Sequence, residues 1–485
     1  MGVSQTFTAY TTIKMRAYPD EQQQELFWKT IGCKRLYWNT LHEDHQYLYH
    51  TEHLNIYPRR AEYLQEYPFF AEVDSHMFDN VMFDYQNAWT KHFNHPKQFG
   101  KPTWKSKKRE HHGTCSYETN NLFQRRKDGN IYESIHFNDA THLHLPKMGS
   151  IQIVRHRLPP KDGKLKTATF EREADGKFYI CLTYEIQISC SAFDVFSVPA
   201  SRILALDMSC PLFYVDQDGR SPLDDDFDME RYPKEALMGL EKRISRKQHE
   251  LGRKVYGSSN YEVFLSREVN SLWTRYRHRK MDFLQKLSSE IANRYDIVIV
   301  ENLNLKAMGH HGFHLGSSVH RNSFSAFLGL LGKKLERRGG RLVRVFRWFP
   351  SSKRCSECGK VRSELSLSER VYECPSCGSV LDRDLNAARN LWVEGVRLLC
   401  GECGVVLCDG LLGYGVLSTH WDCLCDMISN RTDGTSGFGC GAGQRLQVSV
   451  ASVTDDTALR LADGLSVRIS GSGDETAKET QKQAT

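Results

Sequence analysis

The chain has 485 residues, of which 40% are hydrophobic and 26% charged, a length and composition ordinary for a soluble protein of two to four domains. We expect neither a secretory leader nor a membrane span, because the apolar stretch 405–417 is broken by Asp409 and three glycines. Residues 1–399 carry 59 basic and 48 acidic side chains, whereas residues 400–485 carry 6 and 11. A basic body with an acidic tail is consistent with binding to a polyanion.

The N-terminal third alternates between strand and helix patterns. Residues 8–18 alternate in hydrophobicity as a strand does, and Pro19-Asp20-Glu21 then opens a helical region that runs to about residue 95. Its many aromatic side chains suit core packing, with base stacking as the alternative. Residues 130–190 are predicted to be rich in β-strands, with a turn at Asp175-Gly176.

Two basic segments are candidates for nucleic-acid contact. The first combines five cationic side chains with an aromatic ring, a mixture suited to phosphate pairing and base stacking: Lys101, Trp104, Lys105, Lys107, Lys108 and Arg109. The second lies in a predicted helical stretch, 229–294. There a solvated helix face competes with backbone contacts to a nucleic acid, for which the candidates are Arg275, Arg277 and Arg279.

Two short apolar runs each end in a carboxylate. Residues 203–207 end at Asp207 and are predicted to form the buried first strand of a hairpin, with a turn signal at Asp218-Gly219. Residues 297–301 form a β-branched run typical of a strand covered on both faces, ending at Glu301. An unpaired carboxylate at a buried strand end is costly, so such a group usually pairs with a cation or binds metal. An exposed cap beyond the strand is the alternative.

Four cysteines have the spacing of a structural zinc site. Cys355 and Cys358 form one CxxC pair, and Cys374 and Cys377 form a second pair after a fifteen-residue gap. This spacing predicts a tetrahedral Cys₄ site, with buried or disulfide-bonded cysteines as the alternative. Gly359 and Gly378 follow the two pairs, where a residue without Cβ lets the backbone turn toward sulfur.

A third carboxylate follows these cysteines at the start of a predicted helix. Asp384 and Asp382 compete for a metal-binding role, and the other use of Asp382 is to cap the helix. Three carboxylates from two core strands and one helix start can hold two divalent ions about 4 Å apart, an arrangement that cleaves phosphodiesters. Magnesium suits such oxygen ligands.

The order Asp207, Glu301, Cys₄ ribbon and Asp384-Leu385-Asn386-Ala387-Ala388 resembles the split RuvC nuclease domain of the TnpB family, which is related to type V CRISPR effector nucleases. Residues 16–19, 32–35, 101–109 and 347–353 are also similar to family segments. The resemblance covers roughly residues 1–400. Ser209 departs from the pattern, because Asp207-Met208-Ser209 replaces the more frequent Asp-x-Gly.

The resemblance implies an α/β protein: an RNase H-like (RuvC) nuclease domain with a zinc-ribbon insertion, plus an N-terminal wedge-like β-barrel with an inserted helical bundle. The implied domains are a barrel (1–18 and 96–195), a helical recognition domain (19–95), the nuclease (200–350 and 379–398), the ribbon (351–378) and a tail (399–485), expected to be largely disordered. It implies Asp207, Glu301 and Asp384 as catalytic acids holding two Mg²⁺, with one structural Zn²⁺ on the four cysteines.

The implied activity is Mg²⁺-dependent cleavage of double-stranded DNA, guided by an RNA derived from the transposon end. We expect no membrane partner, and a prokaryotic, cytoplasmic, nucleoid-associated protein. The alternatives are a DNA- or RNA-binding regulator without nuclease activity and an RNA-independent transposase accessory protein. In the tail, six cysteines form a candidate second metal site: Cys400, Cys403, Cys408, Cys423, Cys425 and Cys440. His310, His311, His314 and His320 are interpreted as loop residues.

Overall fold

The computed structural model describes residues 4–106, 113–118, 123–125, 131–191, 193–303, 318, 321–366, 368–403, 405–407 and 413–429, and the strand segments 439–440, 444–445, 457–460 and 466–469. They fall into two compact units. The first comprises Met1–Gln5, Cys190–Leu237 and Arg279–Thr485, and the second comprises Thr6–Ser189 and Met238–His278. Among the described helices, none combines the length and the apolar character that crossing a membrane requires.

A seven-stranded sheet organises the second unit, in the order β2-β8-β9-β1-β7-β6-β5. Its long members are β1 (Ser4–Tyr18), β8 (Lys164–Arg172) and β9 (Phe178–Ser191), and the shorter ones are β2 (Gly113–Glu118), β5 (His136–Phe137), β6 (His142–Leu145) and β7 (Gly149–Val154). The turn predicted at Asp175-Gly176 is confirmed between β8 and β9, where Gly176 has φ +87°. A separate hairpin pairs β3 (Phe123–Arg125) with β4 (Ile131–Glu133).

Two helices pack on this sheet. The predicted start of α1 (Glu21–Thr51) is confirmed, because the Asp20 carboxylate accepts a hydrogen bond from the Gln23 amide and the Gln23 side-chain oxygen accepts one from the Asp20 amide. Two short 3₁₀ turns, η1 (Arg60–Tyr63) and η2 (Pro68–Glu72), lead to α2 (His76–Asn94). Phe27, Tyr37 and Tyr85 are fully buried in a core shared with the strands, so core packing accounts for these aromatic side chains.

A four-stranded sheet lies at the centre of the first unit. Its order is β11 (Val215–Asp216), β10 (Ile203–Asp207), β12 (Ile297–Glu301) and β13 (Arg341–Val345). β10, β12 and β13 are parallel, whereas β11 pairs antiparallel with β10, which confirms the predicted hairpin. The first four residues of both β10 and β12 are buried, as expected for parallel strands covered on both faces.

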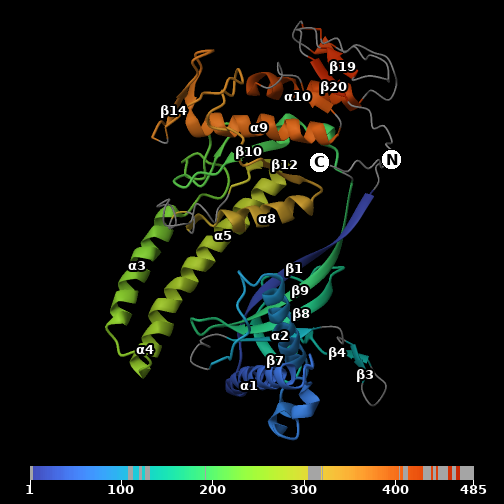
Figure 1. Ribbon diagram of the computed structural model, residues 1–485, viewed down its shortest axis with the longest axis vertical. Coiled ribbons are helices and arrows are strands. Elements are labelled where there is room, and N and C mark those ends of the chain that lie inside the picture. Colours follow the sequence, from blue (N-terminus) through green and yellow to red (C-terminus); the bar gives the residue numbers. More distant parts are fainter. Residues whose placement is uncertain are drawn as a thin grey trace, which may run out of the picture. The chain divides into compact units, whose positions relative to one another are not determined.

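Helices cover both faces of this sheet (Figure 1). α9 (Arg383–Glu402) and α10 (Tyr414–Ser429) lie on one face, and α8 (Phe324–Glu336) lies on the other. The face toward α9 supplies Ile203, Ala205, Ile297 and Ile299 to one core with Leu391 and Val396 of α9. The α8 crossover between β12 and β13 makes these strands parallel, so their carboxyl ends lie at one edge.

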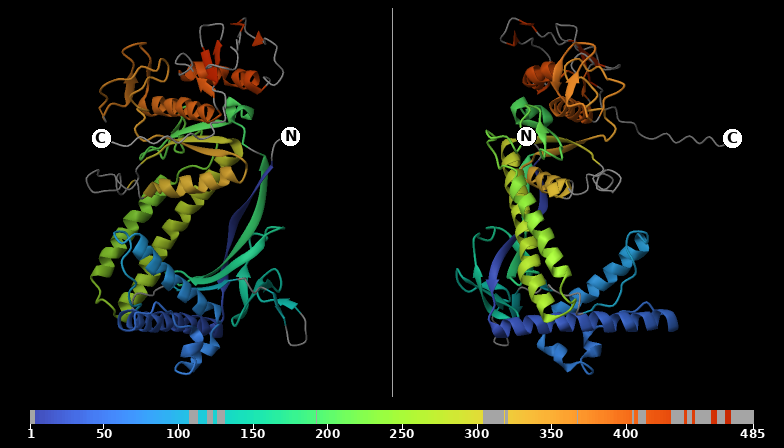
Figure 2. Two further views of the ribbon diagram at one scale, coloured as in Figure 1. Left: turned by 45° about the vertical axis from the view of Figure 1, so that its right-hand side comes forward. Right: turned by 90° about the vertical axis from the view of Figure 1, so that its left-hand side faces the viewer.

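The predicted helical stretch 229–294 forms α3 (Lys234–Gly252), α4 (Ser259–Phe264), a π-helical turn η6 (Leu265–Asn270) and α5 (Ser271–Arg294). Figure 2 shows α3 and α5 side by side in both views. Residues 238–278 of this stretch belong to the second unit, although the expected nuclease segment 200–350 includes them.

The tail departs from the largely disordered segment expected for 399–485. α9 continues through Glu402, and α10 buries Leu417, Trp421 and Leu424 against α9. Their i, i+4, i+7 spacing gives α10 an apolar stripe. This spacing is hard to recognise in the sequence, because the surrounding segment is rich in Ser, Gly and Cys. Between α9 and α10, β16 (Val405–Leu407) pairs with β20 (Ser466–Ile469), which pairs with β19 (Thr457–Arg460). β17 (Gly439–Cys440) pairs with β18 (Gln444–Arg445). The rest of 429–485 lies outside the described residues.

Candidate functional site

Asp207 and Glu301 lie at the same edge of the parallel sheet. Leu206 of β10 is in register with Val300 of β12, and each acid is the next residue of its strand. The sheet therefore brings together two carboxylates that are 94 positions apart in the sequence. Parallel pairing explains this placement, since the carboxyl ends of neighbouring parallel strands coincide.

Asp384 joins this edge from the first turn of α9. The alternative role of Asp382 is confirmed: its carboxylate accepts hydrogen bonds from the amides of Asp384 (2.8 Å) and Leu385 (3.1 Å), which makes it the N-cap of α9. Because Asp382 accepts hydrogen bonds from the first amides of α9, the Asp384 side chain does not have to cap the helix and can make another contact.

The three carboxylates interact electrostatically. Burial, together with the charges of Asp384 and Glu301, raises the pKa of Asp207 to about 8. Burial alone raises the pKa of Glu301 to about 6, and the pKa of Asp384 is raised by burial and by Asp382. Within the described part of the chain, only the four ribbon cysteines have ligand atoms that all lie within 4.8 Å of one another. Glu301 and Asp384 thus each lie close enough to Asp207 to repel its charge, but the ligand atoms of the three carboxylates do not all lie within 4.8 Å of one another.

Ser209, the residue at which the Asp207-Met208-Ser209 segment departs from an Asp-x-Gly pattern, contacts this group. A hydrogen bond from its hydroxyl lowers the pKa of Asp384, as the nearby Arg370 and Arg383 also do. Ser209 is buried, and its amide donates to the carbonyl of Phe213. Sequence reasoning missed this contact, because the only signal was a substitution in a short motif.

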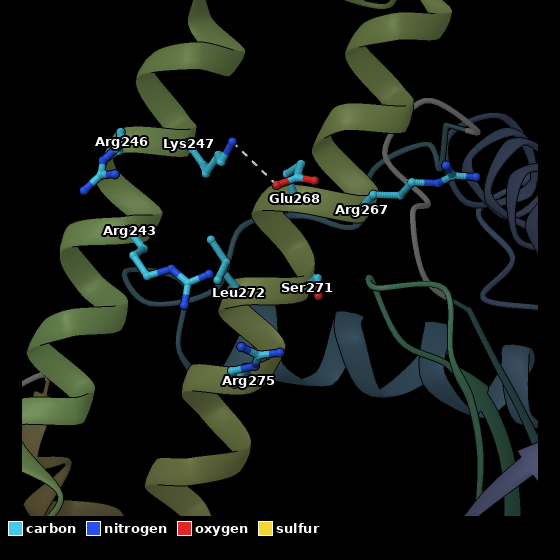
Figure 3. Close-up of a pocket in the computed structure, with 8 residues that line it drawn as sticks. All are labelled: Arg243, Arg246, Lys247, Arg267, Glu268, Ser271, Leu272 and Arg275. Carbon is cyan, nitrogen blue, oxygen red and sulfur yellow. Dashed lines mark ion pairs between the residues drawn. The ribbon is translucent and has the colours of Figure 1, made fainter.

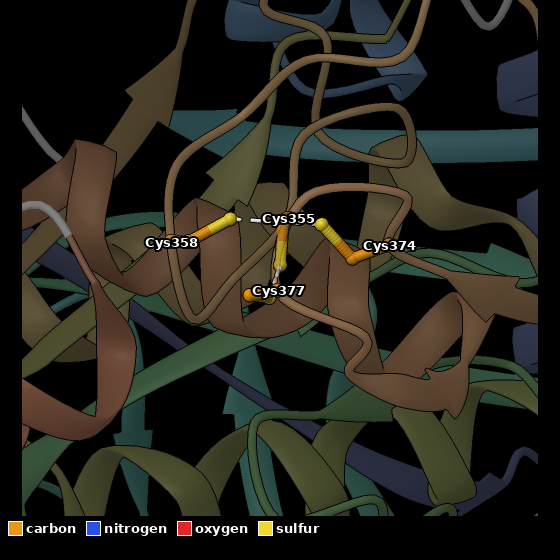
Figure 4. A group of neighbouring side chains, drawn as sticks. All are labelled: Cys355, Cys358, Cys374 and Cys377. Carbon is orange, nitrogen blue, oxygen red and sulfur yellow. Dashed lines mark hydrogen bonds between the residues drawn. The ribbon is translucent and has the colours of Figure 1, made fainter.

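The four cysteines of the ribbon converge in two matching knuckles (Figure 4). In each knuckle the amide of the following glycine donates to the carbonyl of the first cysteine, Gly359 to Cys355 and Gly378 to Cys374. Both glycines have φ +73°, which confirms that the turns need a residue without Cβ. The Sγ atoms of Cys355 and Cys377 lie 3.6 Å apart, as do those of Cys358 and Cys374.

This sulfur-only donor set fits one tetrahedral Zn²⁺, which favours a metal site over the disulfide alternative. Hydrogen bonds from Ser379 lower the pKa of Cys377 to about 6, which favours the thiolate that a metal needs. The short strands β14 (Val371–Glu373) and β15 (Val380–Asp382) hold the second knuckle. β15 ends at the cap of α9.

Two buried asparagines connect the ribbon to α9. The Asn386 side chain accepts from the Ser356 amide (2.9 Å) and donates to the Arg354 carbonyl (2.7 Å). One turn later, Asn390 donates to the carbonyls of Ser351 (2.8 Å) and Arg354 (2.6 Å). The helix that carries Asp384 is therefore fixed to the chain entering the first knuckle. The sequence analysis named Asn386 only as part of a motif. The feature that could have revealed its role is a polar residue at a position of the helix that faces the core.

Part of the first basic segment is held against α1. The Trp38 indole donates to the Thr103 carbonyl (3.0 Å), and the amide of Lys105 donates to Asn39 (2.8 Å). The Lys105 ammonium lies 3.7 Å from the centre of the Trp38 ring, whereas Trp104 is 54% exposed. Lys101 is exposed, and Lys107, Lys108 and Arg109 lie outside the described residues.

The three candidates from the second basic segment have different surroundings. Arg277 pairs with Glu173 (3.3 Å), so part of its charge is used within the protein. Arg279 is exposed, and Arg275 lines a cavity described below. The loop histidines His310, His311, His314 and His320 lie outside the described residues, as does Cys408 of the tail. Cys400, Cys403, Cys423 and Cys425 form no metal-sized cluster among the residues that can be placed.

Three family models match the chain. "Probable transposase" matches residues 215–310, "Helix-turn-helix domain" matches residues 9–53, and "Cas12f1-like, TNB domain" matches residues 324–391, which hold α8, the ribbon and the start of α9. Among solved structures, a Cas12f1 chain bound to single guide RNA and target DNA has a TM-score of 0.50 at 12% identity. The match covers 79% of this chain and 99% of that one. The protein therefore has the overall fold of the Cas12f1 effectors.

The proteins related in sequence are more specific than the match in fold. A Streptomyces pristinaespiralis protein named "Putative RNA-guided DNA endonuclease" is 27% identical over 404 residues, which cover 80% of this chain and 90% of that protein. The TnpB-like protein L79 of Acanthamoeba polyphaga mimivirus is 32% identical over 138 residues, 27% of this chain and 26% of that protein. The chain is related to the TnpB-like proteins, as the motif resemblance predicted.

Proposed function

We propose that this protein is a transposon-encoded, RNA-guided DNA endonuclease that hydrolyses phosphodiesters with two Mg²⁺ ions. The observation that carries the proposal is the meeting of Asp207, Glu301 and Asp384 at one end of the parallel sheet, where their charges act on one another. The name of the Streptomyces relative and the Cas12f1 fold support guidance by RNA. The guide is proposed to come from the transposon end, and the target is double-stranded DNA.

The proposed division of labour follows the two units. The four-stranded sheet with α8 and α9 is proposed to be a RuvC-like nuclease of the RNase H type, and the ribbon a zinc-bound insertion in it. The seven-stranded sheet is proposed to be the wedge-like barrel, and α1 with α2 the recognition helices. The domain boundaries given above, with the nuclease at 200–350 and 379–398, are part of this proposal.

The residues at the sheet edge fit a hard divalent cation. Each of the three side chains offers carboxylate oxygens, which magnesium prefers, and all three are half-buried. The charges of Glu301 and Asp384 both disfavour an ionised Asp207. When bound, Mg²⁺ would activate the attacking water and stabilise the leaving oxygen. The chain's own residues fix the geometry: β10 and β12 fix two carboxylates, the Asp382 cap and the two asparagines fix α9, and Ser209 contacts the third.

Glu301→Gln tests this assignment, because it keeps the size of the side chain and removes the charge. We expect the rate of target cleavage to fall on the order of 10²–10³-fold, the usual loss when one preorganised charge-stabilising group is removed. Binding of RNA and DNA should stay at the wild-type level. Glu235→Gln is the matched control, since Glu235 is exposed on α3 of the same unit.

Rates are measured on a labelled duplex with the guide RNA and Mg²⁺. Cleavage retained by Glu301→Gln would remove this residue from the mechanism. If the wild-type protein binds nucleic acid but cuts nothing in Mg²⁺, the regulator without nuclease activity becomes the better interpretation.

A further inference from the structure

A groove of about 310 Å³ lies between α3 and the segment formed by η6 and α5 (Figure 3). All of its lining residues belong to the second unit, and none is a predicted catalytic acid. Three of them come from α3 and five from the other segment: Arg243, Arg246 and Lys247, then Arg267, Glu268, Ser271, Leu272 and Arg275. Arg275 is one of the candidate contacts that the sequence analysis named.

The groove carries more positive charge than its neighbours neutralise. Five lining side chains are cationic and one is acidic. Lys247 pairs with Glu250 at 2.9 Å and with Glu268 at 3.6 Å, the bridge drawn in Figure 3. Within the described residues, the other four cations, all arginines, form no ion pair. Arg243 and Arg246 are three residues apart on one helix, and like charges at this spacing destabilise a helix.

Contacts on either side hold the groove in shape. On one side, Ser266 and Asn270 of the π-helical turn donate to the Ala174 carbonyl, at 3.5 and 3.3 Å. Between the helices, the Tyr276 hydroxyl donates to Glu241 at 2.9 Å. A π-helical turn is rare and recurs at functional sites, because the wider turn redirects the side chains that follow. The arginines are thus presented by a preformed scaffold.

The lining selects for a chain of phosphates. Leu272 is the single apolar residue of the eight, so the groove offers little to a hydrophobic ligand or a buried base. Figure 3 shows Arg243 reaching from α3 toward Leu272, and Arg275 on the facing segment. Guanidinium groups bind phosphate oxygens in a fork, and four of the eight lining residues are arginines.

We propose that this groove holds the phosphodiester backbone of a nucleic-acid strand. The proposal rests on the proposed function and adds to it a specific contact site outside the catalytic edge. The contact would strengthen binding without reading sequence, because no lining side chain is placed to form a base pocket.

Arg243→Ala and Lys242→Ala in the full-length protein form a sharp test. The two residues are adjacent on α3 and both are exposed, but only Arg243 lines the groove. Binding is measured against salt concentration with fluorescent single-stranded RNA and, separately, with duplex DNA. Each lost phosphate contact should reduce the slope of log K against log salt by about 0.7 on a single strand or about 0.9 on duplex DNA. Arg243→Ala combined with Arg275→Ala should double the loss, and Lys242→Ala should leave the slope unchanged.

The two probes identify the strand. A smaller slope with RNA alone assigns the groove to the guide, a smaller slope with DNA alone assigns it to the target, and either supports the proposal. Wild-type slopes for the double variant on both probes, with an unchanged melting temperature, overturn it. That result would leave the proposed nuclease activity standing if Glu301→Gln still slows cleavage as expected, whereas a wild-type protein that binds neither probe overturns the proposed function as well.

Discussion

At the scale of single residues, the candidate site is a set of charges placed where the fold disfavours charge. Asp207 ends a strand whose other four residues are buried and has two further acids beside it. Burial and like charge both favour the protonated form, so the pKa of Asp207 is raised to about 8. Carboxylates held in this way are poised to take up a cation, which relieves both costs.

This raised pKa predicts a pH-dependent stability of the metal-free protein. Between about pH 4 and pH 8 the folded protein holds a proton on Asp207 that the unfolded chain has released, so the free energy of unfolding falls as pH rises. We expect a melting temperature a few degrees lower at pH 8 than at pH 6, since 1 kcal/mol moves the melting temperature of a domain of 150–250 residues by roughly 2–4 °C.

Asp207→Asn should flatten this difference, and Mg²⁺ should raise the melting temperature more at pH 8 than at pH 6. Differential scanning calorimetry with chelator, and then with Mg²⁺, measures both effects. A wild-type difference that survives in Asp207→Asn would mean that other groups cause it.

At the scale of elements, α9 unites the site. Its N-terminus carries Asp384, its buried asparagines hold the ribbon entry, and its apolar face packs on β10 and β12. Gly395 permits this last contact, because a Cβ at this position would lie 2.4 Å from the nearest atom of the Ile299 side chain. The backbone of α9 can therefore come this close to β12 only because residue 395 has no side chain.

Gly395→Ala should destabilise the protein by about 1–3 kcal/mol, the usual cost of overpacking a core. It should also lower cleavage, since α9 carries Asp384. Gly401→Ala is the matched control in the same helix, because a Cβ there has nothing within 4 Å. The control should change stability by no more than about 1 kcal/mol. Urea unfolding compares the two, and equal stabilities would contradict the packing described here.

At the scale of the whole molecule, two units with separate cores share the work. The first contains the acid edge and the ribbon, and the second contains the seven-stranded sheet, α1, α2 and the cationic groove. The basic excess lies in residues 1–399. On the proposed function, this basic part of the chain would hold RNA and DNA.

Expression with its own flanking DNA should therefore yield protein that copurifies with a discrete RNA. Sequencing of the bound RNA measures this, and the reads should map to the transposon end. The double variant of Arg243 and Arg275 serves as a comparison, since it should retain less RNA after a high-salt wash. Protein that carries no specific RNA yet binds DNA would favour the RNA-independent transposase accessory protein.

The sequence alone predicted the features that depend only on residues close together in the chain. The cysteine pairs with their glycines, the Asp20 cap and the buried β-branched strand 297–301 are of this kind, because spacing, turn geometry and hydrophobicity act locally. The three acids were selected by motif order together with burial at strand ends. Their meeting at one edge depends on parallel pairing through the α8 crossover, which is a property of the sheet.

Tertiary structure alone decided the contacts between distant segments. Ser209 contacts Asp384, and the Asn386 side chain accepts a hydrogen bond from the Ser356 amide. Gly395 lets α9 pack closely on β12, and Trp421, in the segment expected to be a disordered tail, is buried in the core. The groove likewise needs two helical segments, α3 and the one formed by η6 and α5, to lie side by side. A residue's sequence neighbours limit its own conformation, but its partners across the fold are chosen by packing of the whole chain, so these features appear only in three dimensions.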